Sequence, residues 1–298
     1  MPKRKGEDKL IVILGPTSCG KTSLAVKLAK VFNGEIISAD SRQVYKGMDI
    51  GAGKDLDEYG NVPYHLIDVA SPKSQFSLAE YQKLAYKAID DIIKRGKTPF
   101  LVGGAGLYLS AVIDGYRLSD AKPDKKLREH LNTGTLEQLQ KLVAKYKLQL
   151  NKSDFNNKRR IIRNIEIFKS NDQMFTCSNV PRYDCLILGI KYPKKIIDER
   201  IDKRLIHRLE KEGMIDEVKK LHKQGVSWKK LEGFGLEYKW IACYLQKKIS
   251  YDVMAEKLAI AIHQFAKRQM TWFKKDKRIK WIKDYSEAKK TLKKFIKN

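Results

Sequence analysis

One segment near the start of the chain has the residue types and the spacing of a phosphate-binding loop. Residues 15–22 read Gly-Pro-Thr-Ser-Cys-Gly-Lys-Thr, the pattern GxxxxGK followed by Ser or Thr, and they lie between an apolar run at 10–14 and helical spacing at 21–32. Glycine lets backbone N–H groups face a phosphate, and the helix start adds partial positive charge. Lys21 can neutralise phosphate oxygens, and the Thr22 hydroxyl can ligate Mg²⁺. The segment therefore predicts a site for a diphosphate or triphosphate.

A loop of this kind usually works with an acidic residue at the end of a neighbouring strand. Asp40 follows the apolar run 35–39, and Asp68 lies within a possible strand at 64–69. Asp40 is the better candidate, because a strand end would place it beside the loop at the carboxyl edge of a sheet. The pair Asp-Ser is also common at helix and turn caps, so a purely structural role for Asp40 stays open.

Apolar strands alternate with helical stretches in the first part of the chain. Strands are expected at 10–14, 35–39, 64–69 and 99–102, and helices at 21–32 and 78–94. This alternation predicts an α/β fold, a P-loop NTPase-like parallel sheet flanked by helices.

The pattern changes near residue 118. Charged helices are expected at 123–130, 136–146 and 158–168, and a strand returns at 185–190. We predict a core formed by 1–117 and 185–298, with a helical insertion domain at 118–184. After residue 194 the chain is expected to be helical, at 196–212, 214–223, 238–246 and 251–275, with a basic C-terminus. The lysine-rich segment 274–298 fits either a solvated helix or a nonspecific RNA contact.

Charge narrows the class of partner. The 298 residues include 61 Lys and Arg against 35 Asp and Glu, a formal net charge of +26. Such an excess suits a polyanion, most simply nucleic acid, although a lysine-rich surface alone would also produce it. No run approaches the roughly 18–20 apolar residues of a membrane span. The first ten residues, MPKRKGEDKL, contain no apolar signal region, so a cytoplasmic protein without a membrane partner is expected.

Together these motifs resemble the tRNA dimethylallyltransferases, also called tRNA isopentenyltransferases. The matching segments are GPTSCGKT (15–22), ISADSRQVYKGMDIG (37–51), YHLIDV (64–69), FLVGGAGLYL (100–109), RRIIRNIEIF (159–168) and KRQMTWF (267–273). The resemblance implies transfer of a dimethylallyl group from dimethylallyl diphosphate to N6 of adenosine 37 in tRNA, with release of diphosphate. It also implies a P-loop core, Mg²⁺ as cofactor, and a monomer whose core and helical insertion grip the tRNA anticodon stem-loop.

The resemblance assigns roles to individual residues. Asp40 would take the N6 proton as the nitrogen attacks, while Lys21 and Arg204 would neutralise the leaving diphosphate. Arg208, one helical turn beyond, is a rival to Arg204. The residues expected to bind the diphosphate are Gly15, Pro16, Thr17, Ser18, Cys19, Gly20, Lys21 and Thr22, and Thr22 is the expected metal ligand.

The residues expected to contact tRNA come from four segments. They are Asp40, Ser41, Arg42 and Gln43 around the extruded base, Ala105, the group Arg159, Arg160, Ile161, Ile162 and Arg163, and the group Gln264, Lys267 and Arg268. Gln43 could hydrogen-bond an adenine edge, although a surface polar role fits it too. The arginines at 159–163 could equally form a solvated basic face. The family usually has Thr where this chain has Ala105.

Helical spacing sorts the residues of the last long helix. Leu258, Ile262, Phe265 and Trp272 are expected in the core, and Gln264, Lys267 and Arg268 are expected to point away from it.

Three other functions fit parts of the sequence. A P-loop kinase or NTPase accounts for residues 15–22, but not for the basic segment 159–163. A cytokinin-type isopentenyltransferase, which modifies free AMP, ADP or ATP, would not need a helical insertion. A nucleic-acid-binding protein with an inactive loop is disfavoured by the intact Lys21, Thr22 and Asp40.

Overall fold

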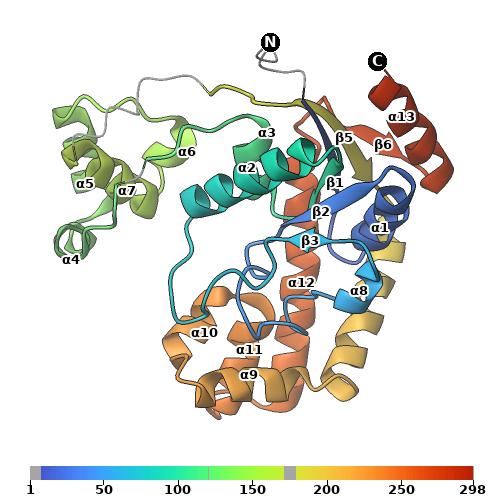
Figure 1. The fold of residues 1–298 in the computed structure, drawn as a ribbon. Coiled ribbons are helices and arrows are strands. Elements are labelled where there is room, and N and C mark those ends of the chain that lie inside the picture. Colours follow the sequence, from blue (N-terminus) through green and yellow to red (C-terminus); the bar gives the residue numbers. More distant parts are fainter. Residues whose placement is uncertain (1–7, 120, 171–178, 298) are drawn as a thin grey trace. The chain divides into compact units, whose positions relative to one another are not determined.

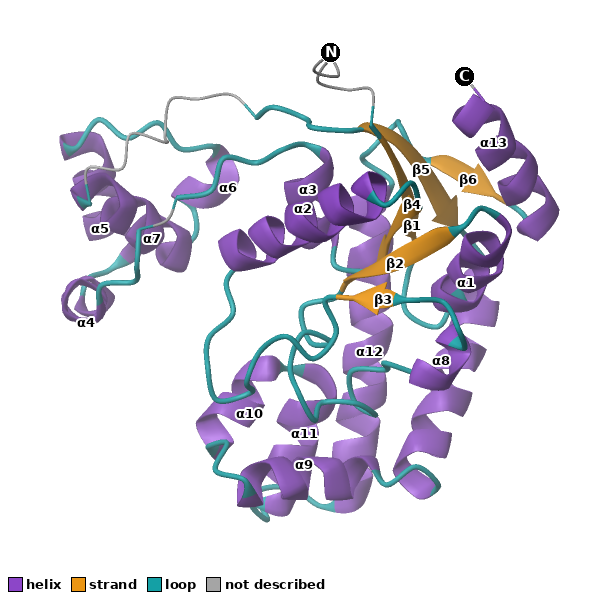
Figure 2. Cartoon of the chain, viewed as in Figure 1, coloured by secondary structure: helices purple, strands orange, loops and turns teal. Residues whose placement is uncertain are grey.

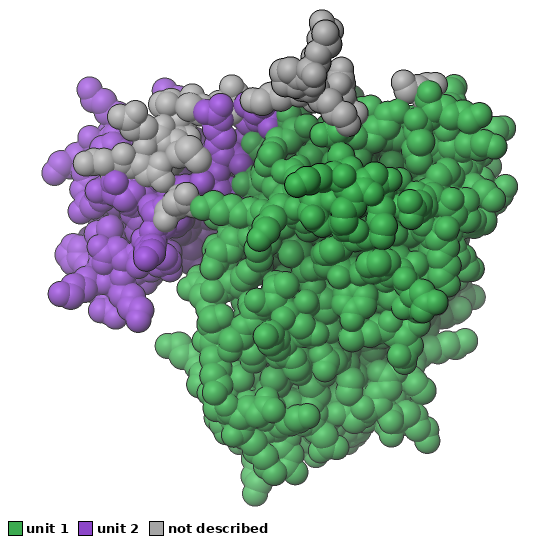
Figure 3. Space-filling model, viewed as in Figure 1, with its two compact units in different colours: residues 1–115, 181–298 green, residues 116–180 purple. Residues whose placement is uncertain are grey.

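The computed structural model describes residues 8–119, 121–170 and 179–297. The chain forms two compact units, one of residues 1–115 with 181–298 and one of residues 116–180 (Figure 3). The larger unit contains a parallel sheet, and the described elements of the smaller unit are helices (Figure 2).

The described residues of the larger unit form a sheet of six parallel strands in the order β3-β2-β4-β1-β5-β6. The strands are β1 (Lys9–Leu14), β2 (Gly34–Ala39), β3 (Tyr64–His65), β4 (Thr98–Gly103), β5 (Asp184–Ile190) and β6 (Lys280–Ile282). In register, Leu14 and Ala39 both pair with Gly103, so β1, β2 and β4 end level with one another. The expected α/β fold with a parallel sheet is confirmed.

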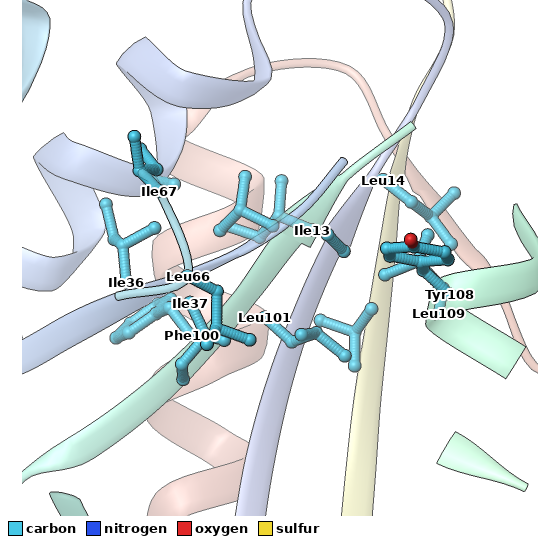
Figure 4. Packing of buried hydrophobic residues seen from close by; sticks show 14 of the residues in the cluster. Ile13, Leu14, Ile36, Ile37, Leu66, Ile67, Phe100, Leu101, Tyr108 and Leu109 are labelled. Atoms are coloured by element: carbon cyan, nitrogen blue, oxygen red, sulfur yellow. The ribbon is translucent and has the colours of Figure 1, made fainter. Parts of the chain in front are cut away.

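Helices cover both faces of this sheet, which explains why its central strands are apolar throughout. The described helices of this unit are α1 (Lys21–Val31), α2 (Leu78–Lys94), α3 (Gly106–Ile113), α8 (Lys194–Glu210), α9 (Met214–Lys223), α10 (Trp228–Phe234), α11 (Leu236–Leu245), α12 (Tyr251–Phe273) and α13 (Tyr285–Lys297), with a 3₁₀ turn η1 (Leu56–Tyr59). Ile13, Ile36 and Phe100 are fully buried and lie together in the core (Figure 4). Helices α9, α10 and α11 gather around one end of the long helix α12 (Figure 1).

The third strand is shorter than its sequence pattern predicts. A strand was expected at 64–69, but β3 covers only Tyr64–His65. Leu66 and Asp68 have φ angles of 63° and 58°, in the left-handed region that no strand can contain. The prediction is therefore wrong for residues 66–69, where the chain turns.

The C-terminal segment is part of the fold. Helices alone were expected after residue 194, which is wrong for Lys280–Ile282, because these residues form β6 and extend the sheet beside β5. Helix α13 then buries Ala288 and Leu292 against the core. The lysines of α13 make this segment strongly charged, so its sequence pattern offered little sign that two of its apolar residues are buried.

The smaller unit consists of α4 (Lys125–Thr133), α5 (Leu136–Lys145), α6 (Lys152–Phe155) and α7 (Lys158–Lys169). Leu131, Leu139 and Val143 form its core with Ile161 and Ile162, which are 0% and 3% exposed. These two isoleucines were expected to contact tRNA, but their side chains are buried and pack α7 into the core of the smaller unit. The insertion was placed at 118–184 from the sequence, and residues 120 and 171–178 of that range lie outside the described residues.

The level strand ends depend on a glycine. A Cβ on Gly103 would lie 2.1 Å from the carbonyl oxygen of Ala39. We therefore expect Gly103→Ala to lower the free energy of unfolding by about 1–3 kcal/mol in urea denaturation. Gly233 in α10 is the control, because a Cβ there meets nothing within 4 Å, and Gly233→Ala should stabilise by roughly 0.5–1 kcal/mol. Equal effects of the two substitutions would contradict this explanation.

A buried carboxylate makes the stability depend on pH. Glu35 on β2 is 2% exposed and accepts hydrogen bonds from Arg95 and, at 2.7 Å, from Lys97. The Arg95 guanidinium, with further help from Lys97 and His65, holds the pKa of Glu35 well below its ordinary 4.5. Its contribution to stability is thus complete above that ordinary pKa and is lost as the pH falls toward the lower folded value.

We expect Glu35→Gln to lower the urea midpoint more at about pH 7 than at about pH 3. The exposed Glu199 is the control, since Glu199→Gln should change the midpoint little at either pH. A Glu35→Gln effect of the same size at both values would show that its ionisation contributes nothing.

Candidate functional site

A cavity of about 390 Å³ opens at the carboxyl edge of the sheet, where β1, β2 and β4 end. Its walls come from the loop after β1, from the turns after β2 and β4, and from α8 and α12. Among the residues selected from the sequence, those lining it are Thr17, Ser18, Gly20, Lys21, Thr22, Asp40, Ser41, Arg42, Gln43, Ala105, Arg204 and Arg208. The fold therefore brings the phosphate-binding loop, the acid after β2 and both rival arginines to one site.

The loop at 15–22 has the backbone conformation that phosphate binding requires. Ser18 and Gly20 have φ angles of 61° and 81°, and Gly20 is the N-cap of α1. Lys21 Nζ donates to the Pro16 carbonyl at 2.7 Å, which holds the ammonium against the loop. The Ser18 hydroxyl is buried and has no hydrogen-bond partner among the described residues. A bound phosphate group fits here, because its oxygens would accept from Ser18 and from the start of α1.

Three residues of this loop support it from beneath. Gly15, Pro16 and Cys19 are buried and do not line the cavity. A Cβ on Gly15 would lie 2.7 Å from Cys19 Sγ, so the glycine lets the loop close over the thiol. The part of the chain that the structure describes contains no group of three or more His, Cys, Asp or Glu side chains able to hold a metal. Thr22 lines the cavity, and its hydroxyl together with the phosphate oxygens of a ligand would supply the oxygen donors that Mg²⁺ prefers.

The two arginines that α8 brings to the cavity have different partners. Arg204 donates to the Thr17 hydroxyl of the loop. Arg208 is 5% exposed and donates to Asp55 at 2.7 Å. Burial, together with the neighbouring charge of Arg208, lowers the pKa of Arg204. An anion in the loop would relieve this repulsion, and it would lie beside Arg204, which favours Arg204 over Arg208 as its ligand.

Asp40 lies at the end of β2 with one carboxylate oxygen engaged. Its Oδ1 accepts from the N–H groups of Arg42 at 2.8 Å and Gln43 at 3.4 Å, as in a turn cap. Within the described ranges of the chain, Oδ2 accepts no hydrogen bond. The two interpretations of Asp40 are thus compatible, because capping the turn orients the second oxygen for a ligand.

The Gln43 side chain is hydrogen-bonded to the turn at Gly53, which forms part of the cavity wall. Its Nε2 donates to the Gly53 carbonyl at 2.8 Å, and its Oε1 accepts from the Ser38 hydroxyl at 2.7 Å. Both ends of the amide are therefore engaged inside the protein. The expected bond from Gln43 to a base competes with these contacts.

Asp68, the rival of Asp40, does not line the cavity. Its Oδ1 accepts from Lys54 Nζ at 2.5 Å, and the same ammonium donates to Asp49 and to the Tyr45 carbonyl. Lys54 is only 1% exposed, so its charge needs these partners. Asp68 therefore has a structural role, and the sequence offered no signal for its pairing with a lysine fourteen residues earlier.

Glu217 was not selected from the sequence, yet it organises the turn that follows Met48. From α9, its Oε2 accepts from the N–H groups of Asp49 at 2.7 Å and Ile50 at 2.6 Å. Its Oε1 accepts from Gly51 N–H at 3.1 Å and from the Tyr238 hydroxyl at 2.9 Å. One carboxylate thus satisfies three consecutive backbone donors, and the last of them, Gly51, lines the cavity.

Gln269 connects two walls of the site. Its Oε1 accepts from the Thr17 N–H and its Nε2 donates to the Gly104 carbonyl, both at 2.9 Å. It lies in the segment KRQMTWF, whose match to the family was the available signal. Ala105 follows as the N-cap of α3, and it makes no side-chain cap bond where the family's usual threonine would carry a hydroxyl.

Helix α12 matches the predicted pattern except at Phe265 and at its end. Phe265 was expected in the core, which is wrong, because it is only partly buried and lines the cavity. Leu258 and Ile262 are buried, while the expected RNA contacts Gln264, Lys267 and Arg268 are exposed. Trp272 was expected in the core, which is wrong, because its side chain is 44% exposed. At this position, in its last turn, α12 exposes the Trp272 side chain to solvent.

The arginines of α7 are not equivalent. Arg159 is exposed and makes no ion pair with any described residue. Arg160 pairs with Asp154 at 2.9 Å. Arg163 donates to the Ala121 carbonyl at 2.7 Å and pairs with the buried Glu166. Of the three, Arg159 is the most available for an anionic partner.

Comparisons with known proteins bear on this site. A family model described as IPP transferase matches residues 43–276, and one described as isopentenyl transferase matches residues 8–61. The tRNA dimethylallyltransferase 1 of Syntrophus aciditrophicus is 46% identical, over 95% of this chain and 97% of its own. The tRNA dimethylallyltransferase 2 of Treponema denticola is 47% identical, over 91% and 95% of the two chains.

Solved structures are similar over nearly the whole chain. The tRNA isopentenylpyrophosphate transferase of Bacillus halodurans has a TM-score of 0.73 and 36% identity, and the match covers 98% of this chain and 96% of that one. A eukaryotic dimethylallyltransferase acting on tRNA has a TM-score of 0.78 at 26% identity, covering 98% and 80%. Among the described residues of this chain, no helix is long and apolar enough to cross a membrane.

We expect Glu217→Gln to lower the free energy of unfolding by about 1–3 kcal/mol, because an amide cannot satisfy three N–H donors and a hydroxyl as a carboxylate does. Thermal and urea denaturation measure the loss. Asp216→Asn, at the exposed neighbouring position of α9, should change stability by less than about 0.5 kcal/mol. A Glu217→Gln protein as stable as the Asp216→Asn control would refute the role given to Glu217.

Proposed function

The chain belongs to the tRNA dimethylallyltransferase (IPP transferase) family, whose reaction is the prenylation of adenosine 37 in tRNA, and we propose that the cavity at the carboxyl edge of its sheet is the place of this reaction. The observation that carries the proposal is the meeting of Asp40, the phosphate-binding loop and Arg204 around one cavity. It supplies an acceptor for a proton and a cradle for a leaving diphosphate.

The loop and α8 act on the leaving group. Dimethylallyl diphosphate binds with its phosphates at the N-terminus of α1, where Lys21, Ser18 and backbone N–H groups donate to their oxygens. Arg204 moves from the Thr17 hydroxyl to a phosphate oxygen. Mg²⁺, held by Thr22 and the diphosphate, supplies further positive charge when bound. Neutralising the diphosphate in this way makes it a good leaving group.

Asp40 acts on the attacking group. The N6 lone pair of adenine is delocalised into the ring, so the amine is a weak nucleophile until its proton leaves. As the N6–carbon bond forms and the carbon–oxygen bond to diphosphate breaks, the N6 proton passes to Asp40 Oδ2. The N–H groups of Arg42 and Gln43 hold the other oxygen, so the carboxylate needs no reorientation.

The proposal extends to the surfaces that hold tRNA. Arg159 on α7 and the exposed Gln264, Lys267 and Arg268 on α12 contact the anticodon stem-loop, mainly through its phosphates. Their exposure and the net charge of +26 support this assignment. We propose that the enzyme works as a monomer, as the resemblance to its family implies.

A transfer assay with labelled dimethylallyl diphosphate and Mg²⁺ tests the proposal. An anticodon stem-loop with three adenosines at the target competes with free AMP and ATP. The stem-loop should take up the label, and Asp40→Asn should lower kcat by about 10²–10⁴-fold without weakening stem-loop binding. Asp252→Asn, at an exposed position in the first turn of α12, is the control and should retain full activity.

Other outcomes identify other functions. Label on free AMP or ATP alone would make the chain a free-nucleotide isopentenyltransferase. Hydrolysis of ATP without any label transfer would indicate a P-loop kinase or NTPase. Unchanged activity in Asp40→Asn, with transfer to the stem-loop intact, would remove Asp40 from the chemistry.

A further inference from the structure

Trp272, in the last turn of α12, is too exposed to be explained by packing. Its side chain is 44% exposed, and Leu107, in the first turn of α3, is 46% exposed. The indole lies against Gly106, where a Cβ would come within 2.5 Å of the ring. A bare glycine thus supports one face of an indole that solvent can reach.

The ring lines a second cavity, separate from the catalytic one. This Trp272 cavity has a volume of about 440 Å³, and its lining includes Gly106, Leu109, Ser110 and Ile113 of α3. An aromatic side chain over an apolar floor is the arrangement on which single-stranded nucleic-acid bases stack. The space suits a flat, partly apolar group.

The rim of the Trp272 cavity is positively charged. Its two acids, Asp114 and Asp276, both accept from Arg278 at 2.7 Å, which offsets one of their two charges, and Lys275 and Lys277 exceed the other. Lys275 and Lys277 are exposed and form no ion pair within the described part of the chain. The rim therefore presents cations without partners, which favours an anionic occupant such as a nucleic-acid strand.

The two cavities share a wall. Gly104 and Ala105 line the catalytic cavity, and the next residue, Gly106, lines the Trp272 cavity. On α12, Gln269 faces the first cavity and Trp272 the second, three residues apart, or about 4.5 Å along the helix axis. A strand that delivers one base to the first cavity therefore has its next nucleotide within reach of the second.

We propose that Trp272 stacks on the base of the nucleotide adjacent to the target adenosine, with Lys275 and Arg268 holding the connecting phosphates. Extruding a base from an RNA loop leaves its neighbour without a stacking partner, and an exposed indole replaces that partner. The contact adds binding energy for RNA without base specificity, since every base has a face that can stack. This inference rests on the proposed function of the catalytic cavity.

Two variants separate stacking from simple apolar packing. Trp272→Phe keeps an aromatic face, whereas Trp272→Leu keeps only apolar volume against Gly106. Stem-loop binding is measured by fluorescence anisotropy, and transfer of the dimethylallyl group is measured in the same samples. Trp272→Leu should weaken binding about tenfold and Trp272→Phe by less, with kcat at saturating stem-loop unchanged. Tyr251→Leu is the matched control, an aromatic position 39% exposed at the other end of α12, and it should bind like the wild type.

Stem-loops lacking one base test which group occupies the cavity. One lacks the base on the 5′ side of the target, and another lacks the base on the 3′ side. One of them should bind the wild type about tenfold more weakly and lose nothing further with Trp272→Leu. If the losses add for both stem-loops, or if Trp272→Leu binds like the wild type, the inference is overturned.

Two further results have distinct meanings. Sedimentation showing a dimer that Trp272→Leu dissociates would assign this face to a second copy of the chain and overturn the inference. Wild-type protein that binds the stem-loop but transfers no label to it would overturn the proposed function. In that case the stacking result would still show whether Trp272 contacts RNA.

Discussion

The level ends of β1, β2 and β4 bring three walls of the candidate active site together. Leu14 and Ala39 both pair with Gly103, and no side chain larger than hydrogen fits between Gly103 and the Ala39 carbonyl. Because the strands end together, the loop after β1, Asp40 after β2 and the turn after β4 open into one cavity. Gln269 then ties the first and third of these loops together with two hydrogen bonds.

Carboxylates within the protein pair with particular cations and backbone N–H groups, and this pairing lets a strongly basic chain form an ordered binding site. Glu217 satisfies three backbone donors, Asp55 pairs with Arg208, and Glu237 pairs with Arg42 at 2.7 Å. Each removes a cation or a bare donor from competition for the substrate. Lys21 and Arg204 lack such a carboxylate partner among the described residues, and both lie at the phosphate-binding loop. At this cavity, the cations without a carboxylate partner thus lie at the loop proposed to bind the diphosphate.

Sequence patterns predicted the structural features that depend on residues close together in the sequence. The loop at 15–22, five of the six described strands and the position of Asp40 at a strand end all have local signatures. Glu217, the Lys54–Asp68 pair and the bonds of Gln43 join residues that local patterns do not relate. Trp272 continues the helical spacing of the apolar residues of α12, but its side chain lies at the surface in the last turn of this helix. The periodicity therefore predicted burial for a side chain that is exposed. The left-handed Leu66 ended a strand that its apolar character had extended.

The use of the diphosphate explains why this P-loop site departs from that of an NTPase. An NTPase attacks phosphorus, so it needs an acid near the terminal phosphate for metal or water. Here the electrophile is carbon, and the diphosphate only departs. The strand β4 can therefore end in glycines, and Asp68 is free to neutralise Lys54. Asp40, which lines the cavity beside the phosphate-binding loop, is the residue that we propose for the acceptor amine, because the loop itself has no group that could take the proton of that amine.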